Sequence, residues 1–221
     1  AAYDLPSFVS PTLKWERIQT LDIGGDFGFF NNELNISFDW YQRTTKDMLA
    51  PGQTMPDVLG AGAPKINAGT LRTRGWELSI DWRHHFNEIN VYANASIGDF
   101  KTVITKWDND SQLLNENYSG KVYGDIWGFE TDRYFTKDDF NADGSYKEGI
   151  ASQKKLEQDG FVYGPGDIKF KDLNNDKEIN GGEGTVKDHG DLKVIGNTTP
   201  RYQYGFRLGG EWKGIDIDMF F

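Results

Sequence analysis

Apolar and polar side chains alternate in six segments of the chain, and the segments come in pairs. The pairs are residues 20–29 with 34–41, 76–83 with 91–98, and 204–212 with 215–221. A period of two residues is typical of a β-strand that presents its two faces to different surroundings. The two segments of each pair are separated by a few residues, such as Asn31-Asn32-Glu33, the stretch from His84 to Glu88, or Lys213-Gly214. The pattern therefore predicts six strands in three antiparallel β-hairpins.

The connections between the hairpins are much longer than the turns within them. They run over residues 43–71 and 101–200. Outer-membrane β-barrels alternate in this way, with short periplasmic turns and long extracellular loops. The alternating stretches hold about 9–11 residues, enough for a tilted strand to cross a bilayer. We therefore predict an all-β fold, a segment of about six strands from a large antiparallel transmembrane β-barrel with long extracellular loops.

Alternation alone leaves a second fold open. In a soluble β-sandwich the polar face of each strand faces water, whereas in a membrane barrel it faces the lumen. Six strands in a membrane would also leave two unpaired edges in hydrocarbon. The barrel interpretation consequently requires further strands outside this stretch. The sequence begins without an initiating Met and stops within an apolar pattern, as expected of a fragment.

Composition narrows the functional classes. The 221 residues include no Cys and carry a formal net charge of −10. The lack of Cys excludes disulfides and thiolate chemistry. The acidic balance argues against a nucleic-acid partner, because phosphate binding needs a basic surface. No apolar run approaches the length of a transmembrane helix.

Residues 104–199 contain most of the negative charge and no clear alternation. Aromatic residues and glycines are interleaved there, as in the stretch 123–129. Loops of this length are normally functional. Two interpretations stand: a partly disordered acidic loop, or a folded extracellular subdomain that contacts a ligand or a partner. Residues 152–158 are expected to form one or two helical turns.

One segment of this loop has the spacing of a calcium-binding loop. Oxygen-bearing side chains occupy positions 1, 3, 5, 7, 9 and 12, where Ca²⁺ ligands are expected. Position 6, normally Gly, is Lys177. The alternative is a turn rich in Asx hydrogen bonds without a metal. The candidate ligands are Asp172, Asn174, Asp176, Glu178, Asn180 and Glu183.

Catalytic motifs are not evident. The three histidines, His84, His85 and His189, lack the spacing of a zinc site, and there is no nucleophile elbow, phosphate-binding loop or dinucleotide fingerprint. We therefore predict that the chain is not an enzyme and has no catalytic or cofactor-binding residues.

Several blocks resemble one known family in their order along the chain. They include Leu21-Asp-Ile-Gly-Gly-Asp-Phe-Gly-Phe-Phe-Asn-Asn-Glu-Leu34, Asn67-Ala-Gly-Thr-Leu-Arg-Thr-Arg-Gly-Trp-Glu-Leu78 and Val194-Ile-Gly-Asn-Thr-Thr-Pro-Arg-Tyr-Gln-Tyr-Gly-Phe206. These blocks look like late barrel strands of SusC/RagA-type TonB-dependent outer-membrane transporters. Further matching blocks are residues 13–16, 39–41, 45–49, 164–176 and 213–221. Where this family usually has a Gly-Asp-Gly-like sequence, the chain has Asn175-Asp-Lys177.

The resemblance implies a nutrient importer of Bacteroidetes-type bacteria. Such a barrel encloses an N-terminal plug, pairs with a SusD-like surface lipoprotein and is driven by the TonB complex. Residues 1–221 would be part of the barrel, with residues 104–199 as an extracellular loop and with the plug and TonB box outside this stretch. The expected ligand is an oligosaccharide or a peptide. The alternative function is a soluble or surface-anchored β-sandwich that binds carbohydrate, and a barrel adhesin without transport is a third hypothesis.

Overall fold

The computed structural model describes residues 10–51, 64–109 and 111–221. The chain divides into two compact units. The sheet unit comprises residues 1–108 and 199–221, and the loop unit comprises residues 109–198. Among the described residues, none of the helices has the length and apolar character needed to cross a membrane.

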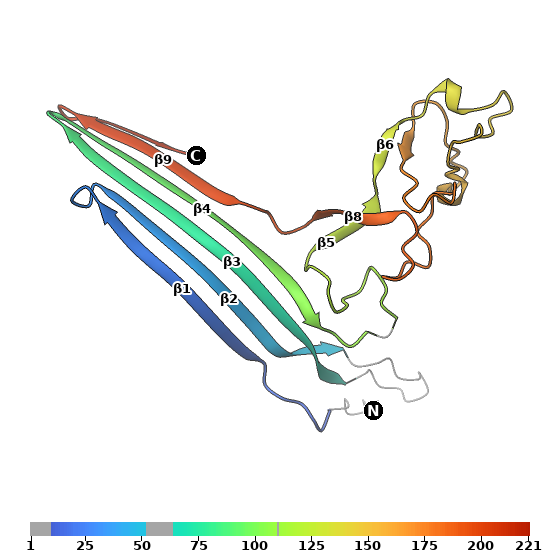
Figure 1. Cartoon of the computed structure of the whole chain (residues 1–221), viewed down its shortest axis with the longest axis horizontal. Coiled ribbons are helices and arrows are strands. Elements are labelled where there is room, and N and C mark those ends of the chain that lie inside the picture. The colour runs from blue at the N-terminus through green and yellow to red at the C-terminus, as the bar shows by residue number, and fades with distance from the viewer. Residues whose placement is uncertain (1–9, 52–63, 110) are drawn as a thin grey trace, which may run out of the picture. The chain divides into compact units, whose positions relative to one another are not determined.

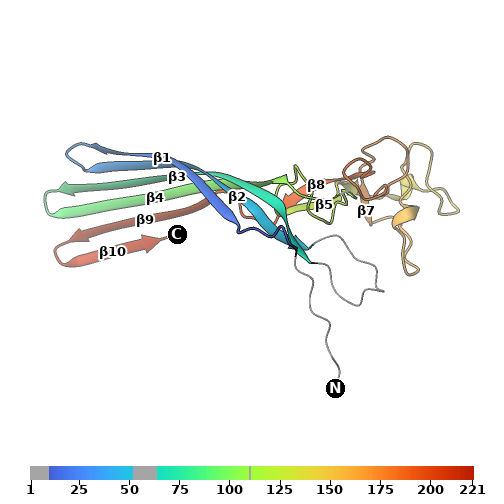
Figure 2. The same cartoon turned by 90° about the horizontal axis from the view of Figure 1, so that it is seen from below.

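The described part of the sheet unit is one antiparallel sheet of six strands (Figures 1 and 2). The strands follow one another in the order β1-β2-β3-β4-β9-β10, so each predicted hairpin forms with its expected neighbours. The prediction of six strands in three hairpins is therefore confirmed. The strand bounds are β1 Arg17–Phe29, β2 Leu34–Pro51, β3 Lys65–Phe86, β4 Ile89–Lys106, β9 Gln203–Trp212 and β10 Ile215–Phe220.

The hairpin turns are tight. Lys213 and Gly214 have φ values of 49° and 83°, which is the left-handed pair that a two-residue hairpin turn requires. The turn between β3 and β4 is shorter than predicted, because His84 and His85 belong to β3. The rings of Trp82 and His84 stack with centroids 6.1 Å apart, and this aromatic row continues the strand.

Three strands are much longer than the alternating segments. β2 and β4 hold 18 residues and β3 holds 22. Beyond Trp40 both faces of β2 carry polar side chains, so the hydrophobic alternation ends although the backbone ladder continues. The predicted connection over residues 43–71 was therefore too long at both ends. Its middle, residues 52–63, lies outside the described residues.

The strand register collects side chains of one kind on each side of the sheet. Ile36 lies opposite Ile80, which lies opposite Ala95, which lies opposite Phe206. We call this side, which includes Leu34, Ile36, Phe38 and Trp40 of β2, the apolar face. The other side, which includes Asn35, Ser37, Asp39 and Tyr41, is the polar face. Since alternation and register agree on all strands, the sheet separates an apolar from a polar medium.

The loop unit is folded around a small core of its own. Strand β5 (Asp125–Phe129) pairs with β8 (Leu192–Asn197), and β6 (Thr131–Tyr134) pairs with β7 (Ile168–Phe170). Two 3₁₀ turns, η2 (Lys137–Asp139) and η3 (Lys154–Leu156), complete the unit, and η3 confirms the helical turn expected in residues 152–158. The interpretation as a partly disordered loop is wrong for the described residues. The buried apolar side chains are Leu114, Tyr118, Phe135, Phe140 and Ile179.

Candidate functional site

The polar face of the sheet carries rows of small hydroxyl and amide side chains. Ser37 lies opposite Ser79, which lies opposite Ser96, and the Ser37 hydroxyl donates a 2.6 Å hydrogen bond to Asp26. On the next row towards the turns, the Asn94 amide donates to Asp81. Side chains of this size leave a shallow hollow of about 370 Å³. Its polar lining residues are Asn35, Ser37, Ser79, Asp81, Asn94, Ser96 and Arg207.

Charged groups on this face are partly paired with one another. Nε of Arg207 donates to a carboxylate oxygen of Asp218 at 2.9 Å, and the Tyr92 hydroxyl donates to the same carboxylate at 2.8 Å. The guanidinium of Arg207 also lies 5.4 Å from the centre of the Tyr92 ring. Acidic residues nevertheless outnumber basic ones among the described strand residues of this face. A face of this kind can hydrate and hydrogen-bond polar solutes, as the lumen of a barrel must.

Two tyrosine rings of this face lie over glycines of the neighbouring strand. A Cβ atom on Gly75 would be 2.5 Å from the Tyr41 ring, and one on Gly209 would be 2.1 Å from the Tyr92 ring. Each glycine thus provides the space into which an aromatic ring folds flat against the sheet. This packing fixes the cross-strand position of both rings.

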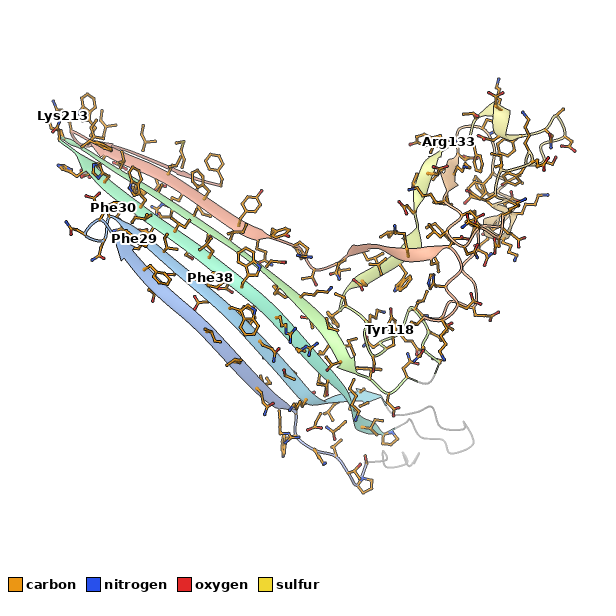
Figure 3. All side chains as sticks on the ribbon, in the orientation of Figure 1. Phe29, Phe30, Phe38, Tyr118, Arg133 and Lys213 are labelled. Atoms are coloured by element: carbon orange, nitrogen blue, oxygen red, sulfur yellow. The ribbon has the colours of Figure 1, made fainter. Side chains whose placement is uncertain are left out.

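The apolar face is not covered by any of the described residues. Ile23, Ile215 and Ile217 each keep 60% of their surface exposed. Figure 3 shows Phe38 on β2, and Phe29 and Phe30 at the turn that follows β1. Trp82, Phe86 and Trp212 lie near the turns, while Trp40 and Trp76 lie opposite each other farther along the strands. An apolar band between two levels of aromatic side chains has the anatomy of a strand surface in contact with lipid.

An ion pair between an exposed arginine and a buried aspartate stabilises the segment 133–139 of the loop unit. Two nitrogens of Arg133 (labelled in Figure 3) donate to the two carboxylate oxygens of Asp139, at 2.7 and 2.6 Å. The Asp139 carboxylate also accepts the backbone N–H of Thr136 at 2.7 Å, although only 4% of the residue is exposed. Arg133 and these further donors hold the pKa of Asp139 well below its usual range. The segment therefore depends on an ionised carboxylate.

The structure brings together only part of the predicted calcium ligands. Carboxylate oxygens of Asp172 and Asp176 converge with one of Asp191, all within 4.8 Å of one another. Asp191 is buried and accepts the backbone N–H of Leu173 and of Asn180, at 2.7 and 3.0 Å. The spacing could not reveal Asp191, because this residue lies outside the twelve-residue loop and reaches the cluster through tertiary contact.

The other predicted ligands have partners within the protein. Asn174 and Asn180 use their side-chain oxygens to accept the backbone N–H of Asp176 and Gly182, at 2.9 and 2.8 Å. Glu178 forms a 2.7 Å ion pair with Lys155. Glu183 is exposed and is not part of the converging group. Asx hydrogen bonds thus shape the segment, as the alternative interpretation expected, and calcium binding stays a prediction.

A groove of about 490 Å³ opens between the strands of the loop unit and its first turn. The groove combines the Trp127 ring with the charged side chains of Lys121 and Asp125. The Lys121 ammonium donates to the backbone carbonyls of Leu114 and Glu116, and the Asp125 carboxylate accepts the Asn197 amide at 2.9 Å. An aromatic ring beside fixed polar groups suits a sugar or a peptide, and nothing in the groove distinguishes the two.

Comparison with known proteins decides what the sheet belongs to. A family model described as "TonB dependent receptor-like, beta-barrel" matches residues 2–186. The chain belongs to this family. It is therefore part of a β-barrel of the outer membrane, and the sandwich fold is wrong for it. Because the family comprises receptors that serve transport, membership also confirms the prediction that the chain is not an enzyme.

Similar TonB-dependent receptors confirm the resemblance to SusC/RagA-type proteins. TonB-dependent receptor P3 of Formosa agariphila is 30% identical over 98% of this chain. TonB-dependent receptor SusC of Bacteroides thetaiotaomicron is 27% identical over 90% of it. The matched regions are 21% and 19% of these two proteins, so the chain spans about one fifth of their length.

Solved structures agree with the fold of this TonB-dependent receptor segment. A structure of the RagAB peptide transporter matches 98% of the chain with a TM-score of 0.66, at 22% identity and over 21% of its own chain. The same transporter in an "open-open" state gives the same TM-score over 97% of the chain. At this identity the match supports the fold, an antiparallel barrel segment.

Proposed function

We propose that this chain is part of the wall and of the extracellular loops of a TonB-dependent importer. The importer would work with a SusD-like surface lipoprotein, and its ligands would be oligosaccharides or peptides. The observation that carries the proposal is the combination of a two-faced transmembrane sheet with a separately folded loop unit of about 90 residues. A structural barrel needs only the sheet, whereas an importer also needs surfaces that capture a ligand before it enters the lumen.

The lengths of the connections support an orientation of the barrel. The three hairpin turns lie at one end of the strands, whereas β2 ends and β3 begins, and β4 ends and β9 begins, at the other end. Outer-membrane barrels place short turns in the periplasm. Residues 104–199 would then lie outside the cell, where a surface lipoprotein is also found.

The loop unit offers apolar side chains that a partner could cover. Val162 keeps 68% of its surface exposed, and Tyr134 and Phe161 keep 67% and 49%. Such side chains are costly on a surface in water and are typical of a contact with another protein. This region supports the loop unit as part of the contact with the SusD-like lipoprotein. Peptide as the ligand class is supported by the RagAB transporter, whereas the groove at Trp127 suits a peptide and a sugar equally.

The proposal is tested on the full-length receptor that contains this chain. Residues 109–198 are replaced by a short Gly-Ser linker, and the amount of SusD-like lipoprotein that co-purifies is measured. We expect the barrel to assemble and the retained lipoprotein to fall at least tenfold. Full retention of the lipoprotein by the deletion variant would overturn the proposed contact.

Point variants refine the same experiment. The double change F161S/V162S removes exposed apolar surface while leaving the ion pair of Arg133 intact, and we expect it to weaken lipoprotein retention. Tyr123, which is 54% exposed before β5, provides the matched control Y123S. Equal loss in both variants would mean that exposed aromatics in general, rather than this region, hold the partner.

A further inference from the structure

We propose that the apolar side of the sheet ends in a binding site for phosphate-bearing glycolipid headgroups of the outer leaflet. The site is a basic strip of four residues on strands β2, β3 and β4. It consists of Lys46, Arg72, Arg74 and Lys101. The inference rests on the proposed orientation of the barrel, and it concerns the lipid around the barrel rather than the imported solute.

The strand register places the strip on the same side as the lipid-facing residues. Trp40 lies opposite Trp76, and two residues farther along the strands Gln42 lies opposite Arg74, which lies opposite Lys101. Side chains two residues apart share a face and are separated by about 7 Å along a strand. Arg74 and Lys101 therefore lie just beyond the tryptophan level that ends the apolar band, at the depth of lipid headgroups.

The rest of the strip continues the same face outward. Arg72 comes two residues before Arg74 on β3 and lies opposite Thr44, and Lys46 comes two residues after Thr44 on β2. On β1, Arg17 lies opposite Lys46 and is paired with Asp47. The four residues of the strip itself thus occupy three neighbouring strands at successive levels, so they form an extended basic surface.

This arrangement is unfavourable without an anion. Arg74 and Lys101 face each other directly across two strands, and like charges in that position destabilise a sheet. In the described part of the chain, Lys46, Arg72 and Lys101 have no carboxylate partner. The carboxylates nearby are already used, since Asp99 is held by Arg201 and Asp47 by Arg17. Nε of Arg74 donates to the Gln42 side chain at 2.8 Å, which orients this guanidinium.

A lipid phosphate suits the strip better than a soluble anion does. The strip is continuous with the apolar band, so a molecule with acyl chains can cover both surfaces at once. Guanidinium groups bind phosphate through paired hydrogen bonds, and two arginines with a lysine could hold a phosphate on a sugar ring. At the turn end of the same face, Trp82, Phe86 and Trp212 occupy the corresponding levels. Lys213, whose ammonium lies 5.5 Å from the centre of the Trp212 ring, is paired there with Glu88. Among the described strand residues of this face, the cations without a carboxylate partner therefore lie at the end with the long connections.

The experiment uses the full-length receptor in detergent and bis-phosphorylated lipid A as the probe. Binding is followed by native mass spectrometry, with assembly checked by heat-modifiable electrophoretic mobility. We expect R74Q to lower affinity several-fold and R72Q/R74Q/K101Q to lower it at least tenfold. Arg43 lies between Gln42 and Thr44 on the polar face, so R43Q is a matched control that should bind as the unchanged protein does.

Competition with a second lipid tests whether the site is specific for a phosphorylated glycolipid. Phosphatidylglycerol has a phosphate but no sugar ring, and we expect it to displace lipid A poorly. The proposal is overturned if the triple variant binds lipid A unchanged, if R43Q weakens binding as much as R74Q, or if phosphatidylglycerol competes equally well. None of these readouts depends on transport or on the lipoprotein, so failure here leaves the proposed function standing.

Discussion

The sheet unit and the loop unit use similar side chains in opposite ways. In the loop unit Phe135 and Ile179 are 2% and 0% exposed, as in the core of a protein that folds in water. In the sheet unit Ile23, Ile215 and Ile217 remain largely exposed, although they lie in regular, well-paired strands. Burial by other protein atoms is therefore a poor guide to the position of the apolar medium in this chain. For the sheet that medium is lipid.

The two units also differ in where they place their polar side chains. The loop unit encloses Asp139, Gln153 and Asp191 and satisfies them with backbone and side-chain partners. The sheet instead lines one whole side with polar groups, which a barrel keeps hydrated. Changes that exchange the two environments should consequently have very different costs in the two units.

The largest effect is expected from a charge on the apolar face. Ile80 lies in the middle of the apolar band, opposite Ile36 and Ala95, and I80R should destabilise the full-length barrel by about 2–4 kcal/mol in a bilayer. The neighbouring variant S79R projects into the lumen and should cost much less. Urea titration of folded barrel in vesicles measures both, and equal costs would contradict the assignment of the faces.

A smaller effect is expected from the ion pair of the loop unit. D139N removes the charge that Arg133 grips and weakens the turn at Thr136, and we expect a loss of about 1.5–3 kcal/mol confined to this unit. D132N removes an ion pair with Lys169 in which the carboxylate side chain is 36% exposed, against 5% for Asp139, and it should cost less than D139N, about 1 kcal/mol. Hydrogen exchange by mass spectrometry reports both units at once. Faster exchange in β2 or β3 after D139N would show that the units do not unfold separately.

Acid should loosen the loop unit before the sheet. Lys171 and Lys193 lower the pKa of Glu130 to about 2, and Arg133 lowers that of Asp139. A carboxylate with a lowered folded-state pKa stabilises the fold above its unfolded value of about 4 and loses this contribution as the pH falls. Protection of the loop-unit amides, measured relative to their intrinsic exchange rate at each pH, should therefore fall between about pH 4.5 and pH 2. Unchanged protection over this interval would contradict the role of the two carboxylates.

The smallest effect concerns calcium. If the predicted loop binds Ca²⁺, Asp172 and Asp176 would be ligands together with Asp191, and we expect weak binding of about 10⁻⁴–10⁻³ M, as in other extracellular modules. Terbium luminescence on the full-length protein measures this binding. D176N should abolish the signal, and E183Q should leave it unchanged because Glu183 lies outside the converging group. Loss of the signal with E183Q would instead favour the ligand set read from the spacing.

The sequence predicted the sheet well because its information is local. The alternation at residues 34–41 is set by two media on either side of one strand, and the turns at Lys213-Gly214 need particular residues. The ends of β2 and β3 were missed, because polar surroundings on both faces remove the alternation while the backbone ladder continues to Pro51 and back from Lys65. His84 was assigned to a turn because the apolar alternation of this segment ends at Trp82. In the structure, the Trp82 and His84 rings stack and β3 continues to Phe86.

The candidate site was less predictable because it depends on contacts between distant segments. Asp191 joins Asp172 only after the chain has folded back over nineteen residues. The pairing of Glu178 with Lys155 likewise spans the loop unit, so spacing alone could not show that this predicted ligand has another partner. The basic strip appears only when the registers of β2, β3 and β4 are combined.

The most direct test of the two-faced sheet is a cysteine scan along β2, because residues 1–221 contain no Cys that would react beside the introduced one. Single cysteines are placed at each position from 34 to 51 in the full-length receptor, and their reaction with a membrane-impermeant thiol reagent is measured in intact outer membranes. We predict a period of two up to Trp40, with the polar-face positions reacting, followed by reaction on both faces from Gln42 onward. Uniform reaction over residues 34–41 would contradict a lipid-facing sheet.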